Sequence, residues 1–235
     1  GFFVDGTSSL RRKLHPEKGH INADELAYLI LEPIQGEGGY NIPSQDFMDE
    51  IQEVKQEYNI HVIADEIQSG MGRTGKMWAS DHYSLEPDVI GSAKGLRVGA
   101  TVSRSEVFPE EKSRISSTWG AGDIISSLQG ALTLDIIREY DLLENATRRG
   151  EQMKEILRDA DPEGVKDIRG KGLMLAVEFE TKEMMKEVKK AAFKRGLLTL
   201  TCGYSVIRLL PPLDVREREI EMGAELFLKA IDDVT

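Results

Sequence analysis

The sequence contains a single cysteine, Cys202, among 235 residues, which excludes an internal disulfide framework and fits a reducing cytoplasm. No apolar run approaches the roughly 20 residues that a membrane helix needs. The first residues show no secretory signal pattern. Internal repeats and low-complexity tracts are absent. We therefore expect a cytoplasmic protein that does not associate with membranes.

The sequence has fewer basic than acidic residues: 30 Lys and Arg and 41 Asp and Glu give a net charge of −11. Nucleic acids and anionic membranes favour basic patches, so neither is expected as a partner. A small anionic ligand needs only a few local donors and stays compatible with this charge. The histidines lack the spacing of metal ligands, and no metal site is expected; they are His15, His20, His61 and His82.

Apolar runs of strand length alternate with helical patterns through the first two thirds of the chain. The predicted strands are residues 27–33, 61–64, 88–90 and 98–102. The run at 27–33 is continuous, as in a strand that is covered on both faces. Ser44 is expected to begin a helix that Asn59 ends, which makes a strand–helix–strand unit with parallel strands. Helical periodicity predicts two more helices, at residues 124–145 and 146–158.

A break at residues 161–164, which read DPEG, suggests a domain boundary. Beyond it we predict an α+β unit. Its expected strands are residues 165–169, 173–179, 197–201 and 206–209, and its expected helices are residues 182–195 and a last helix from about 216. The sequence thus predicts an α/β protein with domains at residues 1–160 and 161–235.

The stretch from His61 to Lys94 organises the chain. One predicted strand ends in Asp65, and the next leads into Lys94. Ligands of open parallel sheets bind beyond the carboxyl ends of the strands, so this acid and this amine are expected at one site. These two residues could form a structural ion pair, and their residue types alone favour that interpretation. They also suit pyridoxal phosphate, which needs a lysine for its Schiff base and an acid for its ring nitrogen.

The segment IADEIQSGMGRTGKMWASDHYSLEPDVIGSAKG, residues 63–95, resembles the cofactor segment of the class III aminotransferases of fold type I. The resemblance extends from about Ala27 to the end of the chain. It implies part of a pyridoxal-phosphate-dependent large domain with a mostly parallel sheet, followed by a small α+β domain.

The resemblance also assigns roles to single residues. It implies that Lys94 is the catalytic, Schiff-base lysine and that Asp65 pairs with the pyridine nitrogen. Gln68 is expected near the ring hydroxyl. Thr118, in STWGAG, is expected to contact the cofactor phosphate of a partner subunit, which implies a homodimer with a shared active site. Glu66 and Arg73 are expected to be structural.

Two further charged residues are expected to bind substrate. Arg208 lies in the apolar run VIRLL, where an unpaired charge is costly, so we predict a carboxylate partner. The resemblance identifies Glu37, in QGEGG, as that partner. It implies that Glu37 neutralises Arg208 when an omega-amino acid binds and releases it for the carboxylate of 2-oxoglutarate or glutamate.

The resemblance departs from the family in two places. The link at residues 95–103 is short, and the segments that bind the phosphate and stack on the ring are expected upstream of Gly1. We therefore expect this polypeptide alone to bind pyridoxal phosphate weakly or not at all. The predicted reaction is transamination of an omega-amino acid, such as 4-aminobutyrate, with 2-oxoglutarate. An aminomutase or racemase on the same scaffold, and a truncated chain that only dimerises, stay open as alternatives.

Overall fold

A computed structural model describes residues 10–15, 17, 19, 21–111, 114 and 120–235. By their internal contacts the described residues divide into two compact units. The first comprises residues within 1–33, 43–71 and 78–134, and the second comprises residues 34–42, 72–77 and 135–235. The domain division expected at residue 161 stays a prediction.

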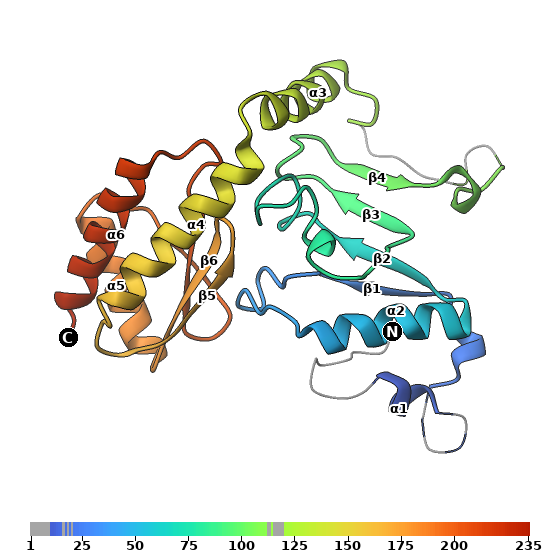
Figure 1. The fold of residues 1–235 in the computed structure, drawn as a ribbon, viewed down its shortest axis with the longest axis horizontal. Helices are drawn as coiled ribbons and strands as arrows, with labels where there is room; N and C mark the ends of the chain where they lie inside the picture. Colours follow the sequence, from blue (N-terminus) through green and yellow to red (C-terminus); the bar gives the residue numbers. More distant parts are fainter. Residues whose placement is uncertain (1–9, 16, 18, 20, 112–113, 115–119) are drawn as a thin grey trace. The chain divides into compact units, whose positions relative to one another are not determined.

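The first unit is built around a four-stranded sheet with the order β1-β2-β3-β4 (Figure 1). Its strands are β1 (Tyr28–Leu31), β2 (His61–Asp65), β3 (Val89–Ser92) and β4 (Ala100–Ser103). The first three strands run parallel and β4 is antiparallel to β3. The mostly parallel sheet that the resemblance implies is confirmed.

Helix α2 (Gln45–Tyr58) follows β1 and has the ends that the sequence predicts. The Ser44 side chain accepts a hydrogen bond from the amide of Phe47, which satisfies one of the free donors of the first turn. Asn59 ends the helix in a left-handed conformation with φ 51°. The apolar face of α2 packs on one side of the sheet, where Met48 and Val54 share a buried cluster with Val62.

The other side of β1 differs from the prediction of a strand that is covered on both faces. Tyr28 is 54% exposed and Ile30 is 62% exposed, whereas Leu29 and Leu31 pack against the α2 cluster. Alternating side chains of a strand point to opposite faces. Among the described residues, helix packing therefore buries one face of this strand only.

The first unit also contains four short elements among its described residues. They are α1 (Leu10–Leu14) and three 3₁₀ helices, Ala23–Glu25, Ala79–His82 and Ser105–Val107. Helix α1 packs its two leucines into the α2 cluster.

Two helices were predicted at residues 124–145 and 146–158, and their boundary was wrong. Helix α3 (Ile124–Glu139) ends early, and helix α4 (Leu142–Asp159) begins before the predicted junction. Asp141 has a left-handed backbone with φ 53°, which breaks the run of helical dihedrals. The apolar periodicity continues across this break, so it did not reveal the boundary.

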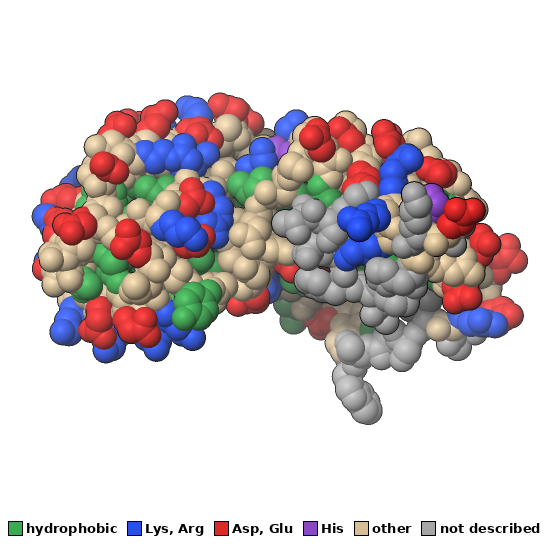
Figure 2. Space-filling view, turned by 90° about the horizontal axis from the view of Figure 1, so that it is seen from below, with side chains coloured by type: hydrophobic (Ala, Val, Ile, Leu, Met, Phe, Trp, Pro, Cys, Tyr) green, Lys and Arg blue, Asp and Glu red, His purple; other side chains and the backbone are tan. Residues whose placement is uncertain are grey.

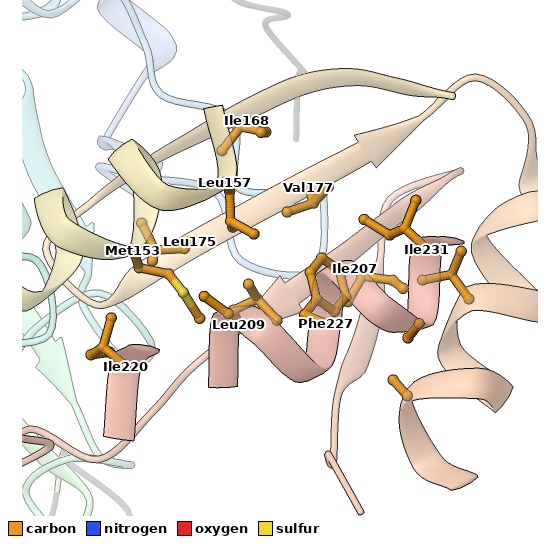
Figure 3. Packing of buried hydrophobic residues seen from close by; sticks show 14 of the residues in the cluster. Met153, Leu157, Ile168, Leu175, Val177, Ile207, Leu209, Ile220, Phe227 and Ile231 are labelled. Carbon is orange, nitrogen blue, oxygen red and sulfur yellow. The ribbon is translucent and has the colours of Figure 1, made fainter. Parts of the chain in front are cut away.

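The second unit contains an antiparallel sheet with the order β5-β6-β8-β7. Its strands are β5 (Val165–Lys171), β6 (Met174–Phe179), β7 (Leu200–Cys202) and β8 (Val206–Leu209). Helices α4, α5 (Lys182–Lys194) and α6 (Glu217–Asp232) supply the rest of the core. Figure 3 shows side chains of α4 and α6, among them Leu157 and Phe227, meeting Val177 and Ile207 of the sheet. The predicted α+β unit is confirmed.

The surface agrees with the acidic composition. Figure 2 shows acidic side chains spread among basic ones over the face in view. In the described part of the chain, no helix is both long and apolar enough to cross a membrane.

Asp88, directly before β3, ties the first sheet to α2. Its carboxylate accepts a hydrogen bond from Val62 N at 2.8 Å and pairs with Lys55 Nζ at 3.1 Å. Arg104 Nη2 lies 3.4 Å away. Burial alone would raise the pKa of Asp88, but the bonds from Val62 and Lys55 outweigh it and lower the pKa below 3.8.

We expect Asp88→Asn to destabilise the protein by about 1–3 kcal/mol at pH 7, because a buried amide and an amine lose their anionic acceptor. Since the native pKa is lowered, this stabilisation is present above pH 3.8 and is lost as the pH falls through the native value. Urea unfolding of both proteins at pH 7 and pH 3 measures the difference. Asp135→Asn, at an exposed position, serves as the control. An equal difference at the two pH values would contradict the expectation.

Candidate active site

Asp65 and Lys94 belong to neighbouring parallel strands of the first unit. Asp65 is the last residue of β2 and lies opposite Gly91 of β3. The amide of Glu66 continues the ladder by donating to Gly91 O at 2.9 Å. Lys94 follows Gly91 by three residues, in the turn beyond β3. Both residues therefore stand at the carboxyl edge of the parallel strands, as predicted.

Close packing brings the turn of Lys94 against the loop that follows β2. A Cβ atom on Gly95 would lie 2.7 Å from Cβ of Met71 and 3.8 Å from Gly70 O. Only glycine fits this approach. The lysine thus stands on a backbone that is fixed by the same loop that begins at Asp65.

In the described part of the chain, neither group is used in an ion pair. The Asp65 carboxylate is partly exposed and accepts one hydrogen bond, from Ile67 N at 3.1 Å. The Lys94 side chain is exposed. Within the described ranges no salt bridge includes either residue, so the interpretation as a structural ion pair has no support. Gln68, in the same loop, is also partly exposed.

Glu66, next to Asp65, has the structural role that was expected. Its side chain is only 1% exposed. It accepts hydrogen bonds from Ser69 Oγ at 2.6 Å, Ala79 N at 3.0 Å, and Ser80 N and Oγ at 2.8 and 2.9 Å. The carboxylate thereby closes the loop between residues 66 and 80. The two adjacent acids therefore serve different purposes, one open to solvent and one internal.

Glu37 and Arg208 form an ion pair inside the second unit. Arg208 lies on β8, opposite Ala176 of β6, and its side chain is 13% exposed. Its Nη1 donates to Glu37 Oε1 at 2.5 Å, and the Glu37 side chain is 69% exposed. Burial alone would lower the pKa of Arg208, but Glu37 and Tyr40 outweigh it and raise the pKa. The carboxylate partner that the apolar strand demands is present.

Tyr40 is a contact of Arg208 that the sequence did not reveal. Its side chain is fully buried, its hydroxyl is hydrogen-bonded to Arg208, and burial raises its pKa. Its backbone is left-handed, with φ 55°. A large aromatic residue in the otherwise small and polar run QGEGGYN was the available signal.

Other expected residues are also placed. Arg73 donates from Nη1 to Pro211 O at 2.6 Å, in agreement with the structural role that was expected. Cys202 is a buried free thiol, and burial raises its pKa to about 11. Thr118 lies outside the described residues. The described ranges contain no cluster of side chains suited to hold a metal ion.

Comparisons with a family model and with known proteins all identify relatives in one family. The family model of class III aminotransferases matches residues 5–231. Acetylornithine aminotransferase of Prochlorococcus marinus is 38% identical over 86% of this chain and 51% of its own. Alanine/serine racemase of Pyrococcus horikoshii is 36% identical over 91% of this chain and 48% of its own.

A solved structure agrees with these relatives. Ornithine aminotransferase from Plasmodium yoelii superposes with a TM-score of 0.83 at 29% identity, covering 88% of this chain and 58% of its own. The chain spans about half the length of the curated relatives it matches. The predicted fold class is confirmed by these matches. With its family model extending over almost all of the sequence, the chain belongs to the class III aminotransferase family.

Proposed function

We propose that the whole protein catalyses pyridoxal-phosphate-dependent transamination between an omega-amino acid and 2-oxoglutarate. Membership of the class III aminotransferase family implies this cofactor. The observation that carries the proposal is the presence of an acid, Asp65, and an amine, Lys94, at one edge of the parallel strands, neither of them in an ion pair among the described residues.

The donor set at this edge fits the cofactor ring. Pyridoxal phosphate, when bound, supplies an electron-accepting ring that stabilises negative charge at a substrate carbon. Asp65 is suited to keep the ring nitrogen protonated, because its carboxylate is accessible and anionic groups stabilise a nearby cation. Lys94 is suited to bind the cofactor's carbonyl carbon covalently and then to carry the proton to and from the substrate. Gln68 is assigned to the ring hydroxyl and Thr118 to the phosphate.

Glu37 and Arg208 are proposed to select the substrate. An arginine that is 13% exposed needs an anionic partner. Glu37 supplies this partner when the substrate presents its distal amine. The Glu37 side chain is 69% exposed. It can therefore rotate into solvent when a substrate carboxylate replaces it on Arg208. One site would then accept both an omega-amino acid, 4-aminobutyrate or ornithine in type, and 2-oxoglutarate.

The proposed assembly is a cytoplasmic homodimer in which Thr118 of one subunit serves the cofactor of the other. The single cysteine supports the location.

Glu37→Gln in the full-length protein tests the substrate assignment. We expect the ratio of kcat/KM for glutamate to kcat/KM for an omega-amino donor to rise about tenfold, equivalent to 1.4 kcal/mol. The physical reason is that Arg208 loses its competing carboxylate and keeps its charge for the substrate. Single-turnover half-reactions with each donor measure the two values. Glu163→Gln, at an exposed glutamate, is the matched control. Equal changes for both donors would refute the selecting role.

Racemisation is the second candidate, because a racemase is among the relatives at 36% identity. A racemase inverts the α-carbon and needs no external 2-oxo acid, whereas a transaminase stops after one half-reaction without it. Chiral chromatography of a single amino acid incubated with the loaded protein separates the two. Conversion without 2-oxoglutarate would replace transamination as the assignment.

A further inference from the structure

The loop of residues 34–42, which carries Glu37, holds its shape through its own hydrogen bonds. The amide of Gln35 donates to Asn41 O at 3.1 Å, and the amides of Gly39 and Tyr40 donate to Gly36 O at 3.2 and 3.4 Å. The Asn41 side chain also donates to Gln35 Oε1 at 2.8 Å. These contacts define the loop but do not attach it to the sheet of the second unit.

Arg169, on β5, makes that attachment. Its Nη2 donates to Gly39 O at 2.6 Å and its Nε donates to Tyr40 O at 3.3 Å. Its Nη1 donates to Asp167 Oδ2 at 2.8 Å and to Glu178 Oε2 at 2.6 Å. One guanidinium thus joins two loop carbonyls to two carboxylates of the sheet. This arrangement needs a planar fork of donors, which lysine does not provide.

A second contact fixes Glu37 itself. The amide of Gly203, in the turn between β7 and β8, donates to Glu37 O at 2.8 Å. Gly203 has φ 54°, and a Cβ atom there would lie 3.1 Å from Cα of Gly39. The backbone of the loop is therefore held at Glu37 and again at Gly39 and Tyr40, while the Glu37 side chain stays exposed.

Two partners of Arg208, the Glu37 carboxylate and the Tyr40 hydroxyl, come from this loop. We propose that Arg169 is a positioning residue: it fixes the loop of residues 34–42 on the sheet, so that Glu37 reaches and leaves Arg208 by rotation of its side chain over a stationary backbone. The link from this geometry to substrate choice rests on the proposed function, whereas the attachment itself does not.

Hydrogen exchange of the full-length protein tests the attachment without any assay of activity. In Arg169→Met, we expect the amide of Gly203 to exchange at least about tenfold faster, because its bond to Glu37 O opens when the loop leaves the sheet. The amides of β6 and β8 are expected to keep their rates. Lys166→Met is the matched control, since Lys166 is on the same strand and also pairs with Glu178, at 2.8 Å. Among the residues that the structure describes, that carboxylate is its only side-chain partner. Unchanged exchange of the Gly203 amide in Arg169→Met, or equal acceleration in both variants, overturns the proposal.

A second variant keeps the test decisive if the methionine protein does not fold. Arg169→Lys retains the charge and the aliphatic stem but loses the fork. We expect it to release the loop as well, with at least about fivefold faster exchange at Gly203. If the Gly203 amide of this variant exchanges as slowly as in the wild type, the proposal is also overturned.

Kinetics then connect the loop to the substrate. For the carboxylate substrate glutamate, we expect Arg169→Met to raise KM about tenfold with kcat within about twofold, because binding at Arg208 is disturbed and the proton transfers at Lys94 are not. If Arg169→Met releases the loop without changing KM, and Glu37→Gln does not change donor preference, the proposed substrate roles of Glu37 and Arg208 are wrong. The attachment of the loop by Arg169 is then still supported. If exchange is unchanged but Glu37→Gln alters donor preference, the attachment alone fails.

Discussion

Replacing Lys94 with alanine is expected to lower turnover by the full-length protein about 10²–10⁴-fold, the range that a positioned proton-transfer group contributes. Lys94 is exposed and forms no ion pair among the described residues, so the substitution removes chemistry rather than packing. Urea unfolding should therefore give the same free energy of unfolding as wild type, within about 0.5 kcal/mol.

Two measurements make this result specific. Borohydride reduction of the loaded wild-type protein, followed by peptide mass spectrometry, should locate the cofactor on the peptide that contains Lys94. Lys189→Ala, at an exposed lysine of α5, should keep full activity. Wild-type turnover in Lys94→Ala, or attachment of the cofactor to another lysine, would remove Lys94 from the reaction.

Glu66→Ala is expected to cost about 3–4 kcal/mol of folding free energy, a large share of the roughly 5–15 kcal/mol that stabilise a domain. The carboxylate accepts from two backbone amides and two hydroxyls while being 1% exposed. Alanine would leave these donors in a buried space without an acceptor. Urea unfolding followed by circular dichroism measures the change.

The neighbouring acid provides the control for this prediction. Asp65 has the same charge and accepts a single hydrogen bond at a partly exposed position. Asp65→Ala should cost less than about 1 kcal/mol of stability. In a cofactor assay the order should reverse, with Asp65→Ala the more damaging of the two folded proteins. Equal stabilities of the two variants would show that Glu66 does not hold its loop closed.

Local signals in the sequence predict the elements well. Ser44 and Asn59 define both ends of α2, because a hydroxyl cap and a left-handed terminal residue are properties of single positions. The edge that holds Asp65 and Lys94 follows from two apolar runs and the rule for parallel strands. Arg208 could be assigned a partner because an apolar strand does not tolerate a lone charge.

Contacts between distant segments were not predictable in the same way. Arg169 and Gly39 are 130 positions apart, and no periodicity connects them. The break at Asp141 was hidden because the apolar pattern continues across it. Tyr40 was missed because its role depends on Arg208, which reaches it only through the fold.

The alternation of strand β2 has a consequence for natural variation in this segment. Val62 and Ala64 are fully buried, whereas Asp65 is at the accessible edge and Glu66 is internal. Deleting one residue between His61 and Ala64 would turn each following side chain to the opposite face. Asp65 would then point into the protein and Glu66 into solvent. Insertions and deletions within these four positions should accordingly be far less tolerated than point substitutions.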